Sequence, residues 1–150
     1  MSSSSDIRLA RPGPHSDLKE LGDRLLGTWK ISGEAQGETS WEWMDGCFFL
    51  IQRGWTRREG AEQTFLQIVG YDRTPGSEPD DAITGRLYTN KGETLVYMCE
   101  LDGDTMTIRI GEKGSPAVYT GTFSAEGNTI EGSWERPLGG YEETMTRVRA

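Results

Sequence analysis

From Gly27 onward the chain is a nearly unbroken series of short apolar segments separated by turn-forming residues. The segments are rich in Val, Ile, Thr, Tyr, Phe and Trp, which favour strands. Residues that tolerate positive φ separate them, at Asp45-Gly46, Asn90-Lys91-Gly92, Asp102-Gly103, Glu126-Gly127-Asn128 and Gly139-Gly140. The spacing leaves no helix-length crossover between strands, so it predicts successive antiparallel hairpins.

These hairpins predict an all-β fold. Strands are expected near residues 28–36, 39–45, 47–57, 62–72, 82–90, 94–102, 104–111, 116–124, 128–136 and 141–149. Such a series can form an open meander, a sandwich or a barrel, and closure favours the barrel because it removes both sheet edges. We therefore predict a closed up-and-down antiparallel β-barrel of about 8–10 strands, wide enough to hold one small ligand.

One segment before the strands has a helical period. Leu18, Leu21, Leu25 and Leu26 fall on one face, Asp17 can cap the start, and Gly27 stands where the helix would end. Because about ten residues of helix are marginal alone, this helix is expected to pack over one mouth of the barrel. Residues 1–14 read as a disordered tail, and residues 15–150 as a single barrel domain.

Composition and charge exclude several classes of partner. The net charge of −8 argues against nucleic acid, which needs clustered Lys and Arg. No run approaches the roughly 20 apolar residues of a membrane span, so no membrane partner is expected. The first residues lack the pattern of a signal peptide, which predicts a cytoplasmic protein with Cys47 and Cys99 as reduced thiols.

The supply of catalytic and metal-binding side chains is limited. The sole histidine, His15, precedes the helix. Catalysis of the Ser-His-Asp or Cys-His type is therefore not expected, because its histidine base must reach the nucleophile. Two scattered cysteines and one histidine do not make a zinc site, so no metal and no cofactor are predicted. Glu42 and Glu100 lie within apolar strands, and alternation along a strand favours an outward position for both.

The first and last strands resemble a known superfamily. Gly27-Thr28-Trp29 is similar to the G-x-W signature of the calycins, the lipocalin and fatty-acid-binding-protein group. Those barrels pair this Trp with an Arg near the end of the last strand. The resemblance implies a structural pair of Trp29 and Arg147, for which Arg149 is a competitor.

A longer likeness covers nearly everything from Leu25 to Arg149. The run from Trp41 to Arg53, WEWMDGCFFLIQR, resembles the "EWLPGG-FLVQR" segment of a bacterial calycin-like family of the DUF1579 type. Val69-Gly70-Tyr71-Asp72 and Gly132-Ser133-Trp134-Glu135 continue the match, whereas Met44-Asp45 stands where that family commonly has Leu-Pro. The family carries no agreed function, so the resemblance implies a fold. The related nitrobindins hold haem through a histidine in a late strand, which this chain lacks.

Alternation along the strands predicts which side chains face the interior. The inward sets are Met106, Ile108 and Ile110 in one strand, Leu95, Tyr97, Cys99 and Leu101 in another, and Ile130 with Trp134 in a third. Trp41 and Trp43 share one face. In the strand near 47–57 both faces are apolar, and the slightly more apolar register, Phe49, Ile51 and Trp55, would bring Arg53 inside. The alternative is that Arg53 lies outward, paired across the sheet with an acidic neighbour.

The leading hypothesis is a binding module that holds a small hydrophobic or amphipathic molecule. A mostly apolar wall with few polar groups is typical of such sites. The alternatives are a cavity-based cyclase or isomerase acting on a natural-product-like substrate, and a filled barrel that serves as an interaction domain; a homodimer is also possible. The candidate ligand-binding residues are Trp41, Trp43, Arg53, Gln67, Tyr97, Tyr119 and Trp134.

Overall fold

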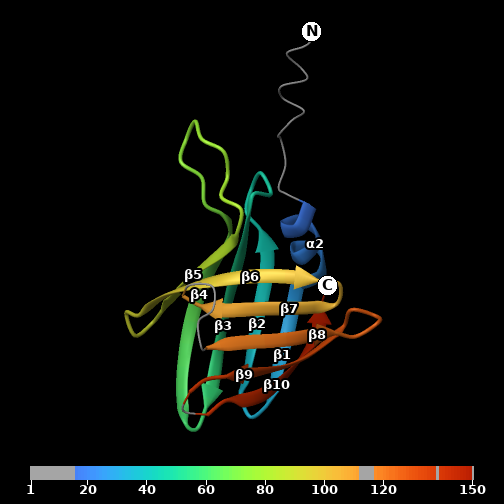
Figure 1. Ribbon diagram of the computed structural model, residues 1–150. Coiled ribbons are helices and arrows are strands. Elements are labelled where there is room, and N and C mark those ends of the chain that lie inside the picture. Colours follow the sequence, from blue (N-terminus) through green and yellow to red (C-terminus); the bar gives the residue numbers. More distant parts are fainter. Residues whose placement is uncertain (1–15, 112–116, 138, 150) are drawn as a thin grey trace.

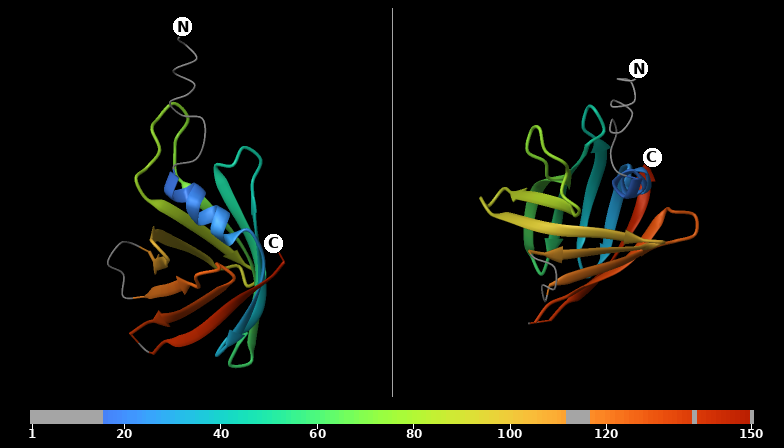
Figure 2. Two further views of the ribbon diagram at one scale, coloured as in Figure 1. Left: turned by 90° about the vertical axis from the view of Figure 1, so that its right-hand side faces the viewer. Right: turned by 45° about the horizontal axis from the view of Figure 1, so that its top comes forward.

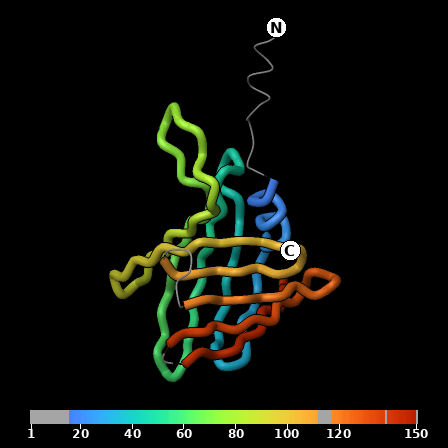
Figure 3. Tube along the Cα trace, in the orientation of Figure 1, coloured from blue at the N-terminus to red at the C-terminus, as the bar shows by residue number. Residues whose placement is uncertain are grey.

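The computed structural model describes residues 16–111, 117–137 and 139–149, which form one helix and ten strands. The expected tail, residues 1–14, and His15 lie outside the described residues. The chain runs as a meander from one strand to the next (Figures 1 and 3). The elements are α2 (Ser16–Leu25), β1 (Gly27–Gly33), β2 (Gln36–Trp43), β3 (Phe49–Arg58), β4 (Ala61–Tyr71), β5 (Ile83–Thr89), β6 (Thr94–Asp102), β7 (Thr105–Ile110), β8 (Val118–Phe123), β9 (Thr129–Glu135) and β10 (Tyr141–Arg149).

The sheet closes on itself, as predicted. Each strand pairs antiparallel with its neighbour in sequence, and β1 pairs with β10 to complete the barrel. In Figure 1 strands β1–β4 stand upright while β6–β8 cross in front of them, so the strands of these two walls run at a steep angle to each other. Closure leaves neither β1 nor β10 with an unpaired edge.

Helix α2 covers one end of this barrel (Figure 2), which we call the helix end. Leu18, Leu21 and Leu25, spaced to fall on one helix face, are almost fully buried and belong to the same core cluster as Leu50. At Gly22 the helix comes so close to the Trp43 ring that a Cβ atom would collide with it. The amphipathic stripe therefore seals the helix end with apolar side chains.

The predicted contact between Trp29 and Arg147 is present at the helix end. Trp29 is fully buried, and the Arg147 guanidinium lies 4.2 Å from its ring centroid. Arg147 donates hydrogen bonds to the carbonyls of Arg24 (2.7 Å) and Leu26, while Trp29 Nε1 donates to the carbonyl of Leu25 (2.8 Å). These carbonyls are the ones that the end of a helix leaves unpaired, so the two side chains cap α2.

The interior positions expected for β6, β7 and β9 agree with their burial, but the expected register of β3 is wrong. Leu50 and Gln52 face inward, since they pair with Trp43 and Trp41, and Arg53 therefore faces outward. The outer face of this region is apolar in its own right. The Phe49 ring fills the space that Gly70 leaves, and Ile51 pairs with Ile68.

Arg53 lies on the outer surface with 61% of its side chain exposed, and its Nη1 is 3.0 Å from Glu42 Oε2. Glu100 is likewise paired outside, with Arg109 at 3.0 Å. Both carboxylates thus occupy the outward positions expected of them.

Cys47 is exposed and Cys99 buried, and neither forms a disulfide. Within the described residues no helix has the length and apolar character needed to span a membrane.

The Trp29–Arg147 contact predicts energetic coupling. Changing Arg147→Met leaves two helix carbonyls unpaired and should lower the free energy of unfolding by about 2 kcal/mol. Trp29→Leu removes the ring on which the guanidinium rests, so the double variant should lose less than the sum of the single losses, by about 0.5–3 kcal/mol. Denaturant unfolding of the four proteins measures this difference. Strict additivity would show that the two side chains act independently.

Candidate functional site

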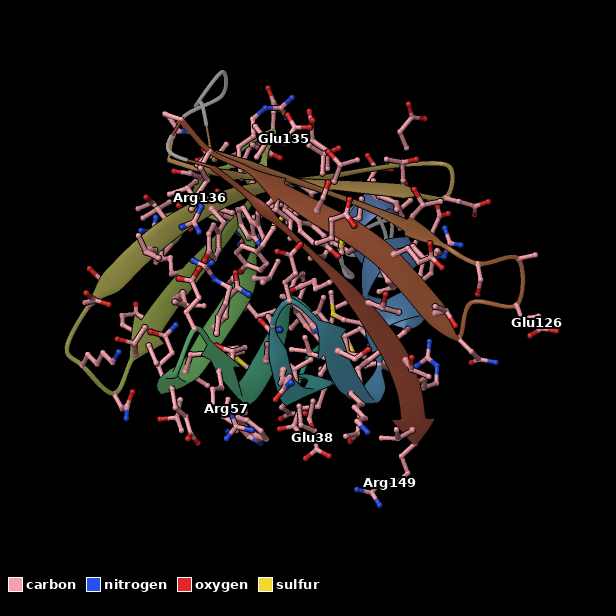
Figure 4. The ribbon with its side chains drawn as sticks, turned by 90° about the horizontal axis from the view of Figure 1, so that it is seen from below. Glu38, Arg57, Glu126, Glu135, Arg136 and Arg149 are labelled. Carbon is pink, nitrogen blue, oxygen red and sulfur yellow. The ribbon has the colours of Figure 1, made fainter. Side chains whose placement is uncertain are left out.

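The two ends of the barrel interior differ in their access to solvent. Inward side chains at the helix end, such as Leu50 and Ile130, are fully buried. At the opposite end, which we call the open end, the inward Leu95 is 37% exposed and Phe65 and Ile110 are only half-buried. The open end is therefore the less covered end of the interior, and Figure 4 views the barrel from this side.

Three aromatic side chains meet in the interior on the wall made by β6, β8 and β9. The Trp134 ring centroid lies 5.4 Å from that of Tyr119 and 6.2 Å from that of Tyr97, and both pairs are tilted. Burial raises the pKa of Tyr97 to about 12 and raises that of Tyr119 as well, so both phenols stay protonated at neutral pH. They are available as neutral hydrogen-bonding groups.

The Tyr119 hydroxyl is buried without a hydrogen-bond partner among the residues that the structure describes. Tyr119 is 1% exposed, and its ring lies over Gly121 and Gly132, where a Cβ atom would collide with it. The two glycines therefore create the space that the phenol occupies. An unpaired buried hydroxyl is costly, and each one in a native fold calls for an explanation.

Glu143 stands next to this hydroxyl. It is the cross-strand partner of Gly132 on one side and of Gly33 on the other, so no side chain crowds the carboxylate from either strand. Burial raises its pKa from 4.5 to about 7. The carboxylate forms no hydrogen bond or ion pair within the described part of the chain.

A chain of polar side chains lines the wall made by β2, β3 and β4. Gln67 Nε2 donates to Gln52 Oε1 (2.5 Å), and Gln52 Nε2 donates to Thr39 Oγ1 (2.8 Å). Thr39 Oγ1 donates in turn to the backbone carbonyl of Arg53 (3.3 Å). The Gln67 carbonyl oxygen lies over Gly85, where a Cβ atom would collide with it, and Gly85 pairs with Tyr97 in β6. The polar chain and the aromatic cluster thus meet across β5.

Two arginines lie at the rim of the open end. The Arg58 guanidinium is 4.2 Å from the centroid of the Tyr141 ring and the Arg136 guanidinium 5.5 Å from it. Arg58 also lies 3.5 Å from Glu59. Figure 4 shows Arg136 at the edge of this opening. The rim is thus cationic, whereas the interior behind it carries the Glu143 carboxylate.

The structure brings together some of the predicted ligand-binding residues and separates the others. Tyr97, Tyr119 and Trp134 form one cluster, and Gln67 approaches it across Gly85. Trp41 and Trp43 face inward but pack against the core of the helix end, with Trp43 under the helix. Arg53 lies outside the barrel, so the expectation that it faces a ligand inside is wrong.

Sequence reasoning missed Glu143 and Gln52. Alternation along the strand from Arg147, the expected partner of Trp29, runs through Met145 to Glu143 and would have placed these three side chains on one face. Glu143 escaped notice because it forms an acidic pair with Glu142 next to a turn, a pattern typical of a solvated surface. Gln52 was missed together with the register of β3. We call the set Gln67, Tyr97, Tyr119, Trp134 and Glu143 the interior site.

A second hollow lies on the outer face and is a weaker candidate. It has a volume of about 580 Å3 and crosses β1, β2 and β3, with Lys30, Glu38, Trp55 and Arg57 among its lining residues. Figure 4 shows Glu38 and Arg57 pointing away from the barrel. Lys30, Glu38 and Arg57 are exposed to water, so this hollow holds no buried polar group that a ligand would satisfy.

Neither a group of metal-binding side chains nor similarity to a known protein indicates a role for the interior site. Within residues 16–111, 117–137 and 139–149, no three His, Cys, Asp or Glu side chains are grouped so that they could hold a metal ion. No protein-family model matches this sequence, and no curated protein matches it.

The unpaired hydroxyl predicts that Tyr119→Phe stabilises the protein. A buried polar group without a partner costs about 1–3 kcal/mol, and Phe fills the same space without that cost. The variant should therefore raise the free energy of unfolding by about 1 kcal/mol in denaturant titrations. A loss of stability would show that the hydroxyl has a partner in solution.

The raised pKa of Glu143 predicts a pH dependence of stability. Because the folded state holds the proton up to about pH 7 and the unfolded state only to about 4.5, the favourable contribution is complete below pH 4.5. It is lost as pH rises through 7, on the order of 1–3 kcal/mol. Glu143→Gln should therefore gain stability relative to the native protein between pH 4.5 and 8.

The matched control for this measurement is Glu142→Gln, which removes the same charge from the neighbouring exposed position. Its stability should follow the native curve across this range. If the difference between Glu143→Gln and the native protein does not vary with pH, the carboxyl group at Glu143 titrates normally.

Proposed function

We propose that this protein binds a small hydrophobic or amphipathic molecule inside the barrel. The observation that carries the proposal is the buried Tyr119 hydroxyl, which has no partner among the described residues and lies beside the Glu143 carboxyl on the inner wall. A bound molecule that met the hydroxyl would remove the cost of leaving it unpaired, and the same molecule could pair with Glu143. The tilted rings of Tyr97 and Trp134 supply the apolar wall that such sites commonly have.

The resemblance to the calycins supports the same proposal. The Trp29–Arg147 contact joins the first and last strands at the position where that superfamily has its Trp–Arg pair. A barrel of ten strands has more interior volume than one of eight, which side chains alone can fill. A calycin-like binding barrel is thus consistent with both the sequence pattern and the closure of the sheet.

A second candidate function is a cavity-based isomerase or cyclase. The observation that favours it is that Glu143, whose pKa burial raises to about 7, lies beside Tyr119. A carboxyl group that titrates near the operating pH is suited to both donate and accept a proton. Purification with the native occupant, identification by mass spectrometry, and incubation of that compound with fresh protein would distinguish turnover from binding.

Binding can be tested with the neutral fluorescent probe N-phenyl-1-naphthylamine. The native protein should bind it saturably, with emission that reports an apolar site. Trp134→Ala removes the central ring of the cluster and should weaken binding about tenfold, which corresponds to 1.4 kcal/mol. Trp55→Ala changes a ring on the outer face and should leave the affinity unchanged. Non-saturating binding, equal in all three proteins, would contradict an interior site.

A further inference from the structure

The hydrogen bonds of the Gln67–Gln52–Thr39 chain have a fixed direction. The chain ends on the backbone carbonyl of Arg53, which can only accept, so the Thr39 hydroxyl must donate to it. Thr39 then accepts from Gln52 Nε2, and Gln52 Oε1 accepts from Gln67 Nε2. The group left at the interior end is the Gln67 carbonyl oxygen, which has no donor among the described residues.

The uncommitted groups of the interior site are therefore mainly oxygen atoms. They are the Gln67 carbonyl, the Glu143 carboxylate and the Tyr119 hydroxyl. One N–H of each glutamine amide also remains, but Glu143 adds a charge with which no described residue forms an ion pair. An ammonium group has three donors and no acceptor, which complements such a set.

These groups lie along one continuous line on the inner wall. Gln67 extends over Gly85, Gly85 pairs with Tyr97, and Tyr97 packs against Trp134. Trp134 in turn contacts Tyr119, whose hydroxyl lies over Gly132 beside Glu143. The strand position of Glu143 is thus next to the aromatic cluster, and the faces of Trp and Tyr attract cations.

We propose that the occupant of the interior site is an organic cation, a protonated amine with an apolar body, whose ammonium group pairs with Glu143. This inference rests on the proposed binding function and narrows it to one class of ligand. The rings of Tyr97, Tyr119 and Trp134 surround the ammonium and its first carbons. The remaining apolar part lies toward the open end, where Leu95 and Ile110 line the interior.

The charges around Glu143 are compatible with this ligand. Among the described residues, Tyr97, Tyr119, Tyr141 and Cys99 are the titratable side chains that share the interior with it, and all are neutral at pH 7, where burial raises their pKa values further. The cations Arg58 and Arg136 are held against Tyr141 at the rim, and Arg58 is paired with Glu59. Desolvation raises the pKa of Glu143, and neither arginine forms an ion pair with it.

The experiment uses three probes that share a phenyl group and a two-carbon linker, which are 2-phenylethylamine, 2-phenylethanol and 3-phenylpropionate. Isothermal titration calorimetry at pH 8 with the full chain should show that the amine binds at least about tenfold more tightly than the alcohol. An ion pair in a desolvated site is stronger than one in water, which is the reason for this margin. The acid should bind most weakly.

Glu143→Gln keeps the shape of the side chain and removes its charge. The amine should then bind within about twofold of the alcohol, while the affinity for the alcohol stays at the native value. Glu142→Gln, which removes an outward charge from the same strand, should keep the native preference for the amine. Near pH 7, amine binding to the native protein should release protons, seen as a heat that depends on the ionisation enthalpy of the buffer.

Three results would overturn the inference. A preference for the acid would place the anchor at the rim arginines, and an unchanged amine preference in Glu143→Gln would exclude the carboxylate as the partner. Equal binding of amine and alcohol to the native protein would refute the ligand class while leaving the proposed binding function intact. If none of the three compounds binds and N-phenyl-1-naphthylamine also fails to saturate, both proposals are wrong.

Discussion

The fold depends on one partly buried cation, Arg147. The Arg147 guanidinium rests on the Trp29 ring and donates to the carbonyls of Arg24, Leu26 and Gly127, which belong to the end of the helix and to the β8–β9 turn. A single side chain of the last strand thereby ties together the first strand, the helix and the adjacent β8–β9 turn. Partial burial lowers the pKa of Arg147. This partial desolvation of a guanidinium is tolerated because acceptors surround it.

The packing at the helix end stabilises the barrel enough that polar groups at the other end can remain without hydrogen-bond partners. The apolar core beneath α2, with Leu21, Leu50 and Ile130, supplies packing that the interior site does not. The backbone ladders of ten strands are complete around the barrel regardless of what the inward side chains do. Tyr119 and Glu143 can therefore remain unpaired at a cost of a few kcal/mol that the rest of the fold offsets. Places where a fold gives up stability in this way are commonly functional.

Alternation predicted the interior wherever one face of a strand is polar. In β7, Thr105, Thr107 and Arg109 mark the outer face, so the inward set was unambiguous. The alternation rule failed at β3 because the outer face there is apolar too, and only the pairing of Leu50 with Trp43 decides the register. The strand order and the closure could be predicted from the spacing of the turns. The interior site could not be predicted, since the contact of Tyr119 with Gly132 depends on strands that the barrel brings together.

Charge is segregated along the barrel axis, and this segregation explains why Glu143 stays unpaired. Arg147 is committed to helix carbonyls at the helix end, while Arg58 and Arg136 are committed to the faces of Tyr141 at the rim. The carboxylate between them has glycine on both neighbouring strands, so no cation of the described residues pairs with it. A cationic ligand would neutralise Glu143, and in its absence protonation limits the cost of burying the group.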